Sequence, residues 1–270
     1  MARMPERWRV QPGTKVKLDD IDPASTVGAP GGKDQTLAAL PPLQEELAGL
    51  QDRLAAERKQ SLLLVLQALD AGGKDGTIHH VFSGVNPQGV RVVSFKVPVG
   101  AELEHDFLWR VHRVTPAAGE IGIFNRSHYE DVLAARVRGL VPEEVWRPRY
   151  ELINGFEALL HHGGTTIVKL FLHISKEEQR RRLEERLRDP DKRWKFRPED
   201  LLDRARWDAY HLAYRDALEK TSTEIGPWYV IPADHKWYRN WAVSRILVKT
   251  LKGMDPRYPQ PVEALPATIE

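Results

Sequence analysis

The sequence predicts an α/β fold, with a parallel five-stranded sheet flanked by helices. Two observations support this prediction. Short apolar segments alternate with segments of helical pattern along the chain, and such alternation produces a parallel sheet with right-handed crossovers. Residues 61–81 combine a strand, a glycine turn and the start of a helix, which is the arrangement of a phosphate-binding loop. The expected strands are residues 62–66, 90–95, 119–125, 165–174 and 228–231.

The glycine turn has the residue types that phosphate binding requires. Glycines allow backbone N–H groups to close around phosphate oxygens, and Lys74 supplies a full positive charge at the start of a helix. The match to the usual pattern is imperfect, because Ala68 replaces the first glycine and Asp75 replaces a serine or threonine. An ordinary strand-to-helix turn is the alternative. The expected phosphate-binding residues are Ala71, Gly72, Gly73, Lys74, Asp75, Gly76 and Thr77.

Composition narrows the class of protein. The chain has 270 residues, 41% of them hydrophobic, which is enough for a sizeable core. The net charge of +2 indicates no general preference for nucleic acid or membrane, so neither is expected as a partner. The absence of cysteine excludes disulfides and cysteine metal sites. No apolar signal segment or membrane-length run is present, and we expect a cytoplasmic protein.

The other segments suggest how the chain is organised. Residues 1–33 are rich in proline, glycine and aspartate and are expected to form an arm. One α/β domain is expected over 34–254, with a lid at about 180–206, followed by a tail over 255–270. Leucines at helical spacing predict a helix over 34–59, namely Leu37, Leu40, Leu43, Leu47, Leu50 and Leu54. Further long helices are expected over 102–114, 142–162 and 240–251.

Polar residues follow two of the predicted strands, where ligands bind in parallel α/β folds. Asp70 follows the first strand, and we expect it to bind Mg²⁺, with a capped turn as the alternative. Asn125 and Arg126 follow the third strand, and an arginine there can bind phosphate with two hydrogen bonds. Glu130 has two compatible roles, because it can approach the metal and can also form a capping box with Ser127.

Residues 180–197 carry nine basic and four acidic residues, a local charge of +5 in a nearly neutral chain. Their position after a helix capped by Ser175 suggests a mobile basic lid that closes over phosphates and excludes water. Arg182 and Arg186 are four residues apart and are expected to share the helix face that meets the phosphates. A solvated helix face and a single-stranded nucleic-acid patch are the alternatives.

These motifs together resemble the polyphosphate kinase 2 family over residues 34–252. The resemblance rests on four segments in order, which are Asp-Ala-Gly-Gly-Lys-Asp-Gly-Thr from Asp70, Asn-Arg-Ser-His-Tyr-Glu from Asn125, Glu-Gln-x-x-Arg-x-x-x-Arg from Glu178, and Asp-Pro-x-Lys-x-Trp-Lys from Asp189. It implies a P-loop kinase fold like thymidylate kinase, with a helical lid. It also implies dimers or tetramers and the transfer of phosphate between polyphosphate and nucleotides with Mg²⁺ or Mn²⁺.

The resemblance further implies roles for individual residues. Asp70 and Glu130 would bind the metal, Lys74 and Arg126 would hold the transferred phosphate, and Arg182 and Arg186 would lie on the lid side. Asn125 stands where many members carry aspartate, which with Glu130 resembles the class III subgroup that acts on AMP and ADP. We therefore expect a polyphosphate-dependent kinase acting on both. An ATP-dependent nucleoside monophosphate kinase and a non-catalytic RNA-binding module are the alternatives.

Overall fold

A single parallel sheet in the order β2-β3-β1-β4-β5 lies at the centre of the computed structural model, which describes residues 4–261. All four strand pairs are parallel, which confirms the predicted fold class, and β1 lies in the middle of the sheet. Each expected strand is present to within two residues at either end. The strands are β1 (Ser61–Gln67), β2 (Val90–Ser94), β3 (Ile121–Asn125), β4 (Thr165–His173) and β5 (Trp228–Pro232).

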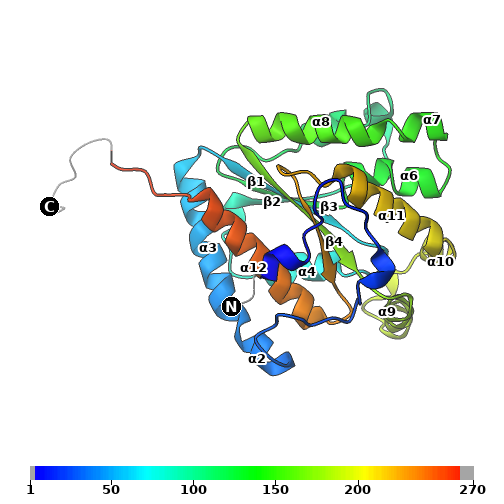
Figure 1. The fold of residues 1–270 in the computed structure, drawn as a ribbon, viewed down its shortest axis with the longest axis horizontal. Coiled ribbons are helices and arrows are strands. Elements are labelled where there is room, and N and C mark those ends of the chain that lie inside the picture. The colour runs from blue at the N-terminus through cyan, green and yellow to red at the C-terminus, as the bar shows by residue number, and fades with distance from the viewer. Residues whose placement is uncertain (1–3, 262–270) are drawn as a thin grey trace.

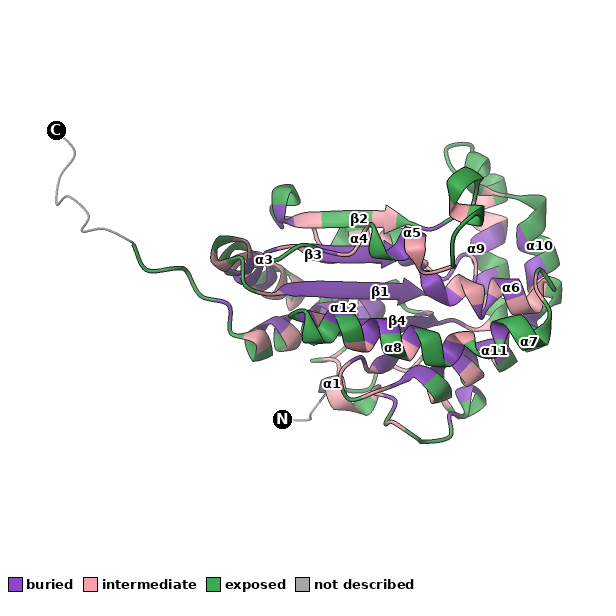
Figure 2. Cartoon of the chain, turned by 90° about the horizontal axis from the view of Figure 1, so that it is seen from above, coloured by how far each residue is buried: buried purple, intermediate pink, exposed green. Residues whose placement is uncertain are grey.

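Helices cover both faces of the sheet (Figure 1). One layer holds α3, α4 and α12, the other α6, α8 and α11, and α9 and α10 lie beyond the strand ends (Figure 2). The helices are α1 (Met4–Arg7), α2 (Lys33–Ala38), α3 (Leu40–Glu57), α4 (Lys74–Val81), α5 (Trp109–His112), α6 (Ala134–Val137), α7 (Glu143–Trp146), α8 (Arg149–His162), α9 (Lys176–Arg188), α10 (Pro198–Ala205), α11 (Trp207–Thr221) and α12 (Lys236–Met254). Short 3-10 helices are η1 (Leu18–Asp20), η2 (Pro87–Gly89), η3 (Gly100–Leu103), η4 (His128–Asp131) and η5 (Arg193–Lys195).

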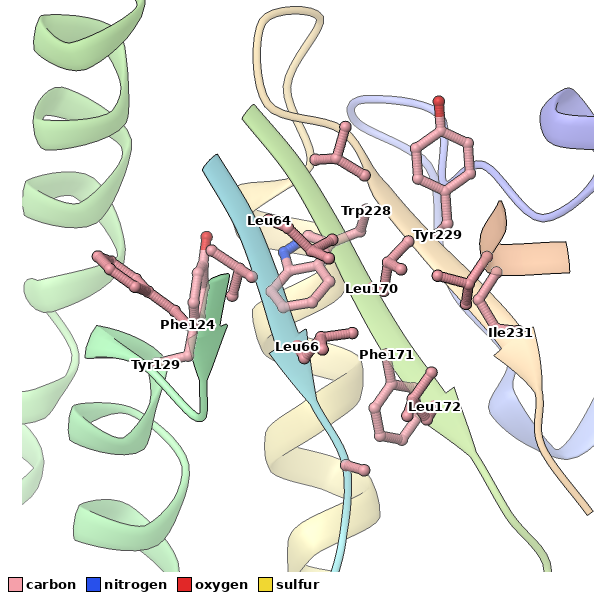
Figure 3. Close-up of a cluster of buried hydrophobic side chains, with 14 of the residues drawn as sticks. Leu64, Leu66, Phe124, Tyr129, Leu170, Phe171, Leu172, Trp228, Tyr229 and Ile231 are labelled. Carbon is pink, nitrogen blue, oxygen red and sulfur yellow. The ribbon is translucent and has the colours of Figure 1, made fainter. Parts of the chain in front are cut away.

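The core forms where the central strands meet the helices. Every residue of β1 is buried, as expected for a strand with packed layers on both faces, and residues 62–66 are therefore an apolar run without alternation. Leu64 of β1 is in register with Ile123 of β3 and Val168 of β4. Figure 3 shows a cluster of buried apolar side chains from β1, β3, β4 and β5, which includes Leu64, Phe124, Phe171 and Trp228. This packing holds the ends of β1 and β3 in fixed relative positions.

The predicted helix over 34–59 is interrupted. It forms as α2 and α3, with the break at Ala39. Pro41 and Pro42 lack N–H groups and cannot complete the hydrogen bonds of a continuous helix, although proline is well accommodated in the first turn of α3. The leucine stripe is buried from Leu47 onward, whereas Leu37 is 40% exposed.

Two more predicted helices are shorter than expected, and one is longer. Residues 102–114 form only η3 and α5, because Asp106 accepts a hydrogen bond from the N–H of Leu108 (2.9 Å) in a local turn. Residues 142–162 form α7 and α8, separated at Pro148. The closing helix α12 begins at Lys236, four residues before the expected start at Asn240.

The N-terminal segment lies along the outer edge of the sheet. The N–H of Val10 donates to the carbonyl of Trp228 (2.8 Å), and the N–H of Val230 donates to the carbonyl of Trp8 (2.8 Å). These bonds cover the exposed edge of β5, which would otherwise be free to pair with another chain. The domain boundaries at 33 and 254 stay predictions, and residues 262–270 of the expected tail lie outside the described residues. Within the described part of the chain, no helix could span a membrane.

His173, at the end of β4, couples this N-terminal segment to pH. Its Nε2 donates to the carbonyl of Ile21 (3.2 Å), and burial, reinforced by His211, lowers the pKa of His173 to about 4. An unfolded histidine titrates near 6.5, so the unfolded state binds more protons between these values. Stability should therefore fall by up to about 3 kcal/mol as the pH drops from 6.5 to 4. Urea unfolding of wild type and His173→Gln at several pH values would measure this, and equal pH slopes would contradict it.

Candidate active site

The candidate site lies at the carboxyl end of the sheet, where the strand arrows point toward α9 and α10 (Figure 2). The loop after β1 leads into α4, and the segment after β3 leads into η4. Leu66 of β1 is in register with Asn125 of β3, and the N–H of Arg126 donates to the carbonyl of Leu66 (3.0 Å). The sheet therefore brings together the first two predicted clusters, although they are some fifty residues apart in sequence.

The phosphate-binding loop is tightly folded. Gly73 has a φ of 99°, and a Cβ atom at Gly72 would lie 2.4 Å from the Cβ of Ala68. A residue with a Cβ atom would be strained at Gly73 because of its backbone conformation, and at Gly72 because of the contact with Ala68. The N–H of Gly72 donates to the carbonyl of Leu69 (2.9 Å), and Thr77 Oγ1 donates to the carbonyl of Gly73 (3.0 Å). The loop is thus held by its own backbone and opens onto the start of α4.

Lys74 is the first residue of α4, and its side chain turns back beneath the loop. Its Nζ donates to the carbonyl of Ala68 (2.9 Å), and the residue is only 9% exposed. Burial lowers its pKa to about 8, aided by the positive charge of Arg126 and opposed by the carboxylate of Asp70. A lysine poised in this way remains mostly protonated at neutral pH and gains stability from an approaching anion.

Arg126 lies between two carboxylates. Its guanidinium forms an ion pair with Asp70 and a second one with Glu130 (3.4 Å between Nη1 and Oε2). Arg126 also has a φ of 62°, in the left-handed region that non-glycine residues seldom adopt. Burial acts to raise the pKa of Asp70, but the charges of Arg126 and Lys74 outweigh it and lower that pKa. Asp70 is therefore ionised at neutral pH and can bind a cation.

The predicted capping box between Ser127 and Glu130 is wrong. Ser127 Oγ accepts a hydrogen bond from the N–H of Tyr129 (3.1 Å), and the side chain of Glu130 is directed to Arg126 instead. A short 3-10 helix places these groups differently from an α-helix. Gln67 is fully buried at the end of β1, and the orientation of its amide that satisfies both of its polar atoms donates to Glu130 Oε1 (3.0 Å) and accepts from the N–H of Ser127 (3.2 Å). Gln67 thus helps to position Glu130.

Asn125 and Asp75 form a second contact between the two clusters. Asn125 Nδ2 donates to Asp75 Oδ1 (2.7 Å), and Lys195 in η5 approaches Asp75 Oδ2 at 3.9 Å. Asp75 was expected among the phosphate-binding residues. In this structure its carboxylate connects β3, the start of α4 and the basic segment over 180–206.

The basic segment over 180–206 forms α9, η5 and α10. Ser175 caps α9 as predicted, by accepting from the N–H of Glu178 (3.0 Å), and the side chain of Glu178 pairs with Arg182 (2.6 Å). Arg186 lies 3.5 Å from Asp200 of α10. That this segment acts as a mobile lid stays a prediction.

Arg182 is not on an exposed face. It is 5% exposed, and its guanidinium donates to the backbone carbonyls of Ala71 (3.0 Å), Ala233 (2.5 Å) and Asp234 (3.2 Å). The expectation that Arg182 and Arg186 share one ligand-facing surface is therefore not met. Arg182 instead joins α9 to the phosphate-binding loop and to the end of β5, and its predicted contact with polyphosphate stays a prediction.

Several residues of the site were missed by the sequence analysis. Arg138 of the α6 region forms an ion pair with Asp203 of α10, and Arg239 of α12 lies against the phosphate-binding loop. Arg138 and Arg239 each belong to an amphipathic or apolar stretch. The pattern of such a stretch indicates a helix packed against the core and gives no sign of a bound ligand. A narrow cavity at the centre of the site is lined by Ala68, Leu69, Asp70, Arg126, Glu130, Leu133, Gln179, Asp203, Tyr210 and Tyr214.

A buried polar network lies behind η4. Lys169 of β4 donates to Glu157 Oε2 (2.5 Å), to Tyr129 Oη (2.9 Å) and to the carbonyl of Thr221 (2.6 Å). His128 also contacts Glu157 (3.3 Å). Burial opposes ionisation of Glu157, but Lys169 and His128 hold its pKa below the usual range. This network anchors His128 and Tyr129, the residues that immediately precede Glu130.

The side chains suit a hydrated divalent cation. Within residues 4–261 no group of three or more histidine or carboxylate side chains could hold a metal ion by itself. Mg²⁺ keeps several waters and is usually held by one or two carboxylates together with substrate phosphates. Asp70, ionised, and Glu130 supply that number of carboxylates beside the phosphate-binding loop. The donor set therefore fits Mg²⁺.

Arg182 should contribute to folding as well as to the site. Arg182→Met removes the donor for three backbone carbonyls and for Glu178, and each buried acceptor left unpaired costs about 1–3 kcal/mol. Urea unfolding should show a clear loss of stability. Arg181→Met is the matched control, because Arg181 pairs with Glu178 at the surface and should change stability by less than about 1 kcal/mol. Equal, small losses in both variants would refute the anchoring role.

Comparisons with known proteins agree with this geometry. A family model described as polyphosphate kinase 2 matches residues 32–259. The chain is 58% identical over 259 residues to an AMP/ADP-polyphosphate phosphotransferase of Meiothermus ruber, covering 96% of this chain and 97% of that protein. It is 46% identical to an ADP-polyphosphate phosphotransferase of Rhodopseudomonas palustris, covering 82% of this chain and 80% of the relative.

A solved structure supports the same assignment. The crystal structure of polyphosphate kinase 2 from Arthrobacter aurescens TC1 superposes with a TM-score of 0.94 at 46% identity, covering 98% of this chain and 94% of that one. This similarity confirms the predicted P-loop kinase fold. With the glycine loop, the sheet order and these relatives in agreement, the chain belongs to the polyphosphate kinase 2 family.

Proposed function

We propose that the protein transfers phosphate from inorganic polyphosphate to AMP and to ADP, forming ADP and ATP, with Mg²⁺. The observation that carries this proposal is the convergence of Lys74, Arg126 and two carboxylates on one glycine loop at the carboxyl end of the sheet. The 58% identical relative is named for action on both AMP and ADP, which supports the same substrates here. Assembly into dimers or tetramers and a cytoplasmic location stay predictions.

The arrangement suits phosphoryl transfer, which depends mainly on positioning and charge neutralisation. The loop N–H groups and Lys74 would hold the transferred phosphate. Arg126 can exchange its carboxylate partners for phosphate oxygens, since guanidinium binds both in the same planar geometry. Asp70 and Glu130 would hold Mg²⁺, which supplies positive charge to phosphate oxygens when bound. Once Arg126 moves toward phosphate, the carboxylates of Asp70 and Glu130 would be free to hold the cation.

Asn125 is central to acceptance of both nucleotides in this proposal. AMP and ADP place their terminal phosphates at different depths, and a carboxylate at position 125 would repel either one. The amide removes that charge, and its Nδ2 donor is held toward Asp75 (2.7 Å). Glu130 supplies its carboxylate from beside Arg126, further along the chain. The strand end is therefore less negative than it would be with aspartate.

Lys74→Met tests the role of the loop lysine. It keeps a side chain of similar length but removes the charge next to the transferred phosphate, and comparable losses cost about 10²–10³ in rate. The turnover of ADP with polyphosphate and Mg²⁺ should fall by that factor while the protein stays folded. Lys59→Met is the control, because Lys59 is exposed at the opposite end of β1. A Lys74→Met enzyme as active as the control would refute the assignment.

A time course from AMP tests the substrate assignment. With polyphosphate as the sole donor, wild type should form ADP first and ATP later, resolved by chromatography. Glu130→Gln keeps the shape of the side chain but removes the carboxylate, and it should change the ratio of the two steps. Glu151→Gln, at an exposed position of α8, should leave that ratio unchanged. Wild type that stops at ADP, or a Glu130→Gln enzyme that slows both steps equally, would count against this proposal.

A further inference from the structure

Arg239, in the first turns of α12, is a buried cation with no carboxylate partner among residues 4–261. It is 2% exposed, and within this part of the chain its hydrogen bonds run only to Asn240 Oδ1, from Nε (3.1 Å) and Nη2 (2.8 Å). An amide oxygen carries no net charge, so the guanidinium charge is not balanced. A charge left unpaired in a protein interior is strongly unfavourable. Such a group is retained most readily where a bound anion balances it.

The phosphate-binding loop is shaped around this guanidinium. A Cβ atom at Gly73 would lie 2.0 Å from Arg239 Nη1, and one at Gly76 would lie 3.5 Å from Nη2. The guanidinium therefore abuts the first turn of α4, whose free N–H groups also carry positive partial charge. Nη1, which forms no hydrogen bond within the described residues, lies at this turn. The guanidinium of Arg239 and the N–H groups of the first turn of α4 are therefore adjacent hydrogen-bond donors. Among the described residues, no acceptor lies between them.

The charges nearby favour the donor chain as the ligand. Arg182 and Lys236 lie on the same side of the loop as Arg239, the side of α9 and β5, and positive charge from Arg182 acts on both of the others. Arg182 pairs with Glu178, and Lys236 lies 4.0 Å from Glu185, so Arg239 is the member of this group without a carboxylate partner among residues 4–261. Burial, followed by Arg182, lowers the pKa of Arg239 to about 9. Asn125 and Arg126 lie on the opposite side, at the end of β3. Polyphosphate carries a negative charge on every unit, so it requires such an extended row of cations, whereas the transferred group alone does not.

We propose that Arg239 binds polyphosphate directly, at the phosphate unit adjacent to the one being transferred, on the α9 and α12 side of the loop. In the free enzyme the unpaired charge of Arg239 destabilises the fold, and bound polyphosphate balances this charge. Binding of the donor is therefore favoured, because it removes the cost of an unpaired buried charge. The acceptor nucleotide enters from the β3 side and makes no contact with it. This inference rests on polyphosphate as the donor.

Arg239→Met separates this role from a structural one, because methionine fills similar space without charge. The midpoint of thermal unfolding of the free protein should rise by a few degrees, and the further rise caused by long-chain polyphosphate without nucleotide should shrink. In assays with Mg²⁺, KM for polyphosphate should increase at least about tenfold, which corresponds to 1.4 kcal/mol, while KM for ADP stays within about twofold. Arg239→Lys, which keeps the charge, should retain a larger response to polyphosphate than Arg239→Met.

Arg245→Met is the matched control, because Arg245 lies on the same helix but is exposed. It should change neither the unfolding midpoint nor either KM. An unchanged KM for polyphosphate in Arg239→Met overturns the proposal, whatever happens to stability, and so does an increase confined to ADP. A lower unfolding midpoint with an unchanged polyphosphate response assigns Arg239 to folding alone. A wild-type protein whose unfolding midpoint does not respond to polyphosphate would instead contradict the proposed donor.

Discussion

The buried ion pair between Lys169 and Glu157 is the interaction on which the geometry of the site depends. Both side chains are essentially inaccessible, and Lys169 also donates to Tyr129 Oη and to the carbonyl of Thr221. Four elements therefore meet at one ammonium group, namely β4, α8, η4 and the end of α11. Removing one partner of such a pair costs about 3–5 kcal/mol, because the other charge is left buried. The pair thereby holds η4 in one position relative to the sheet.

This constraint reaches the site through a short stretch of chain. Tyr129, held by Lys169, directly precedes Glu130, and Ser127 receives a hydrogen bond from the Tyr129 N–H. Arg126 can then adopt its left-handed backbone conformation, because η4 and the N–H···O bond to Leu66 determine the chain on either side of it. In this conformation Arg126, which follows β3, forms its ion pair with Asp70, which follows β1. The buried network around Lys169 thus positions the charged groups of the site, although its own side chains do not face the ligand.

Positive charge on the two sides of the loop is balanced in different ways. On the β3 side, Arg126 is balanced by Asp70 and Glu130. On the β5 side, Arg182 is satisfied by Glu178 and by backbone carbonyls, whereas among residues 4–261 Arg239 has only an amide oxygen as its partner. The α10 helix contributes Asp200 and Asp203, which pair with Arg186 and Arg138. Each of these carboxylates occupies an arginine that phosphate could also bind, so a polyanion would compete with α10 for its contacts.

Much of the architecture could be predicted from the sequence, because the responsible signals are local. An apolar run followed by glycines and a lysine can be recognised without knowledge of the rest of the chain, and this identified β1, the loop and Lys74. Alternation of strands and helices similarly determined the parallel sheet. The same reasoning failed at Ala39 and Pro148, where the predicted helices are interrupted at or next to prolines, which lack the N–H group that a continuous helix needs. It also failed at Ser127, whose capping pattern fits an α-helix, whereas the chain forms a 3-10 turn.

The partner of each charged group was decided by tertiary structure alone. Arg182 lies in a basic run that is typical of a solvated or ligand-facing helix, yet folding directs it onto the carbonyls of Ala71 and Ala233. Arg239 lies in an aromatic helix that carries no phosphate-binding pattern, yet it reaches Gly73, which is more than 160 residues earlier in the chain. Residue type and spacing determine local conformation, because that depends on neighbours in sequence. Charge pairing depends on which side chains meet in space, and only the packing of α9 and α12 against the sheet determines that.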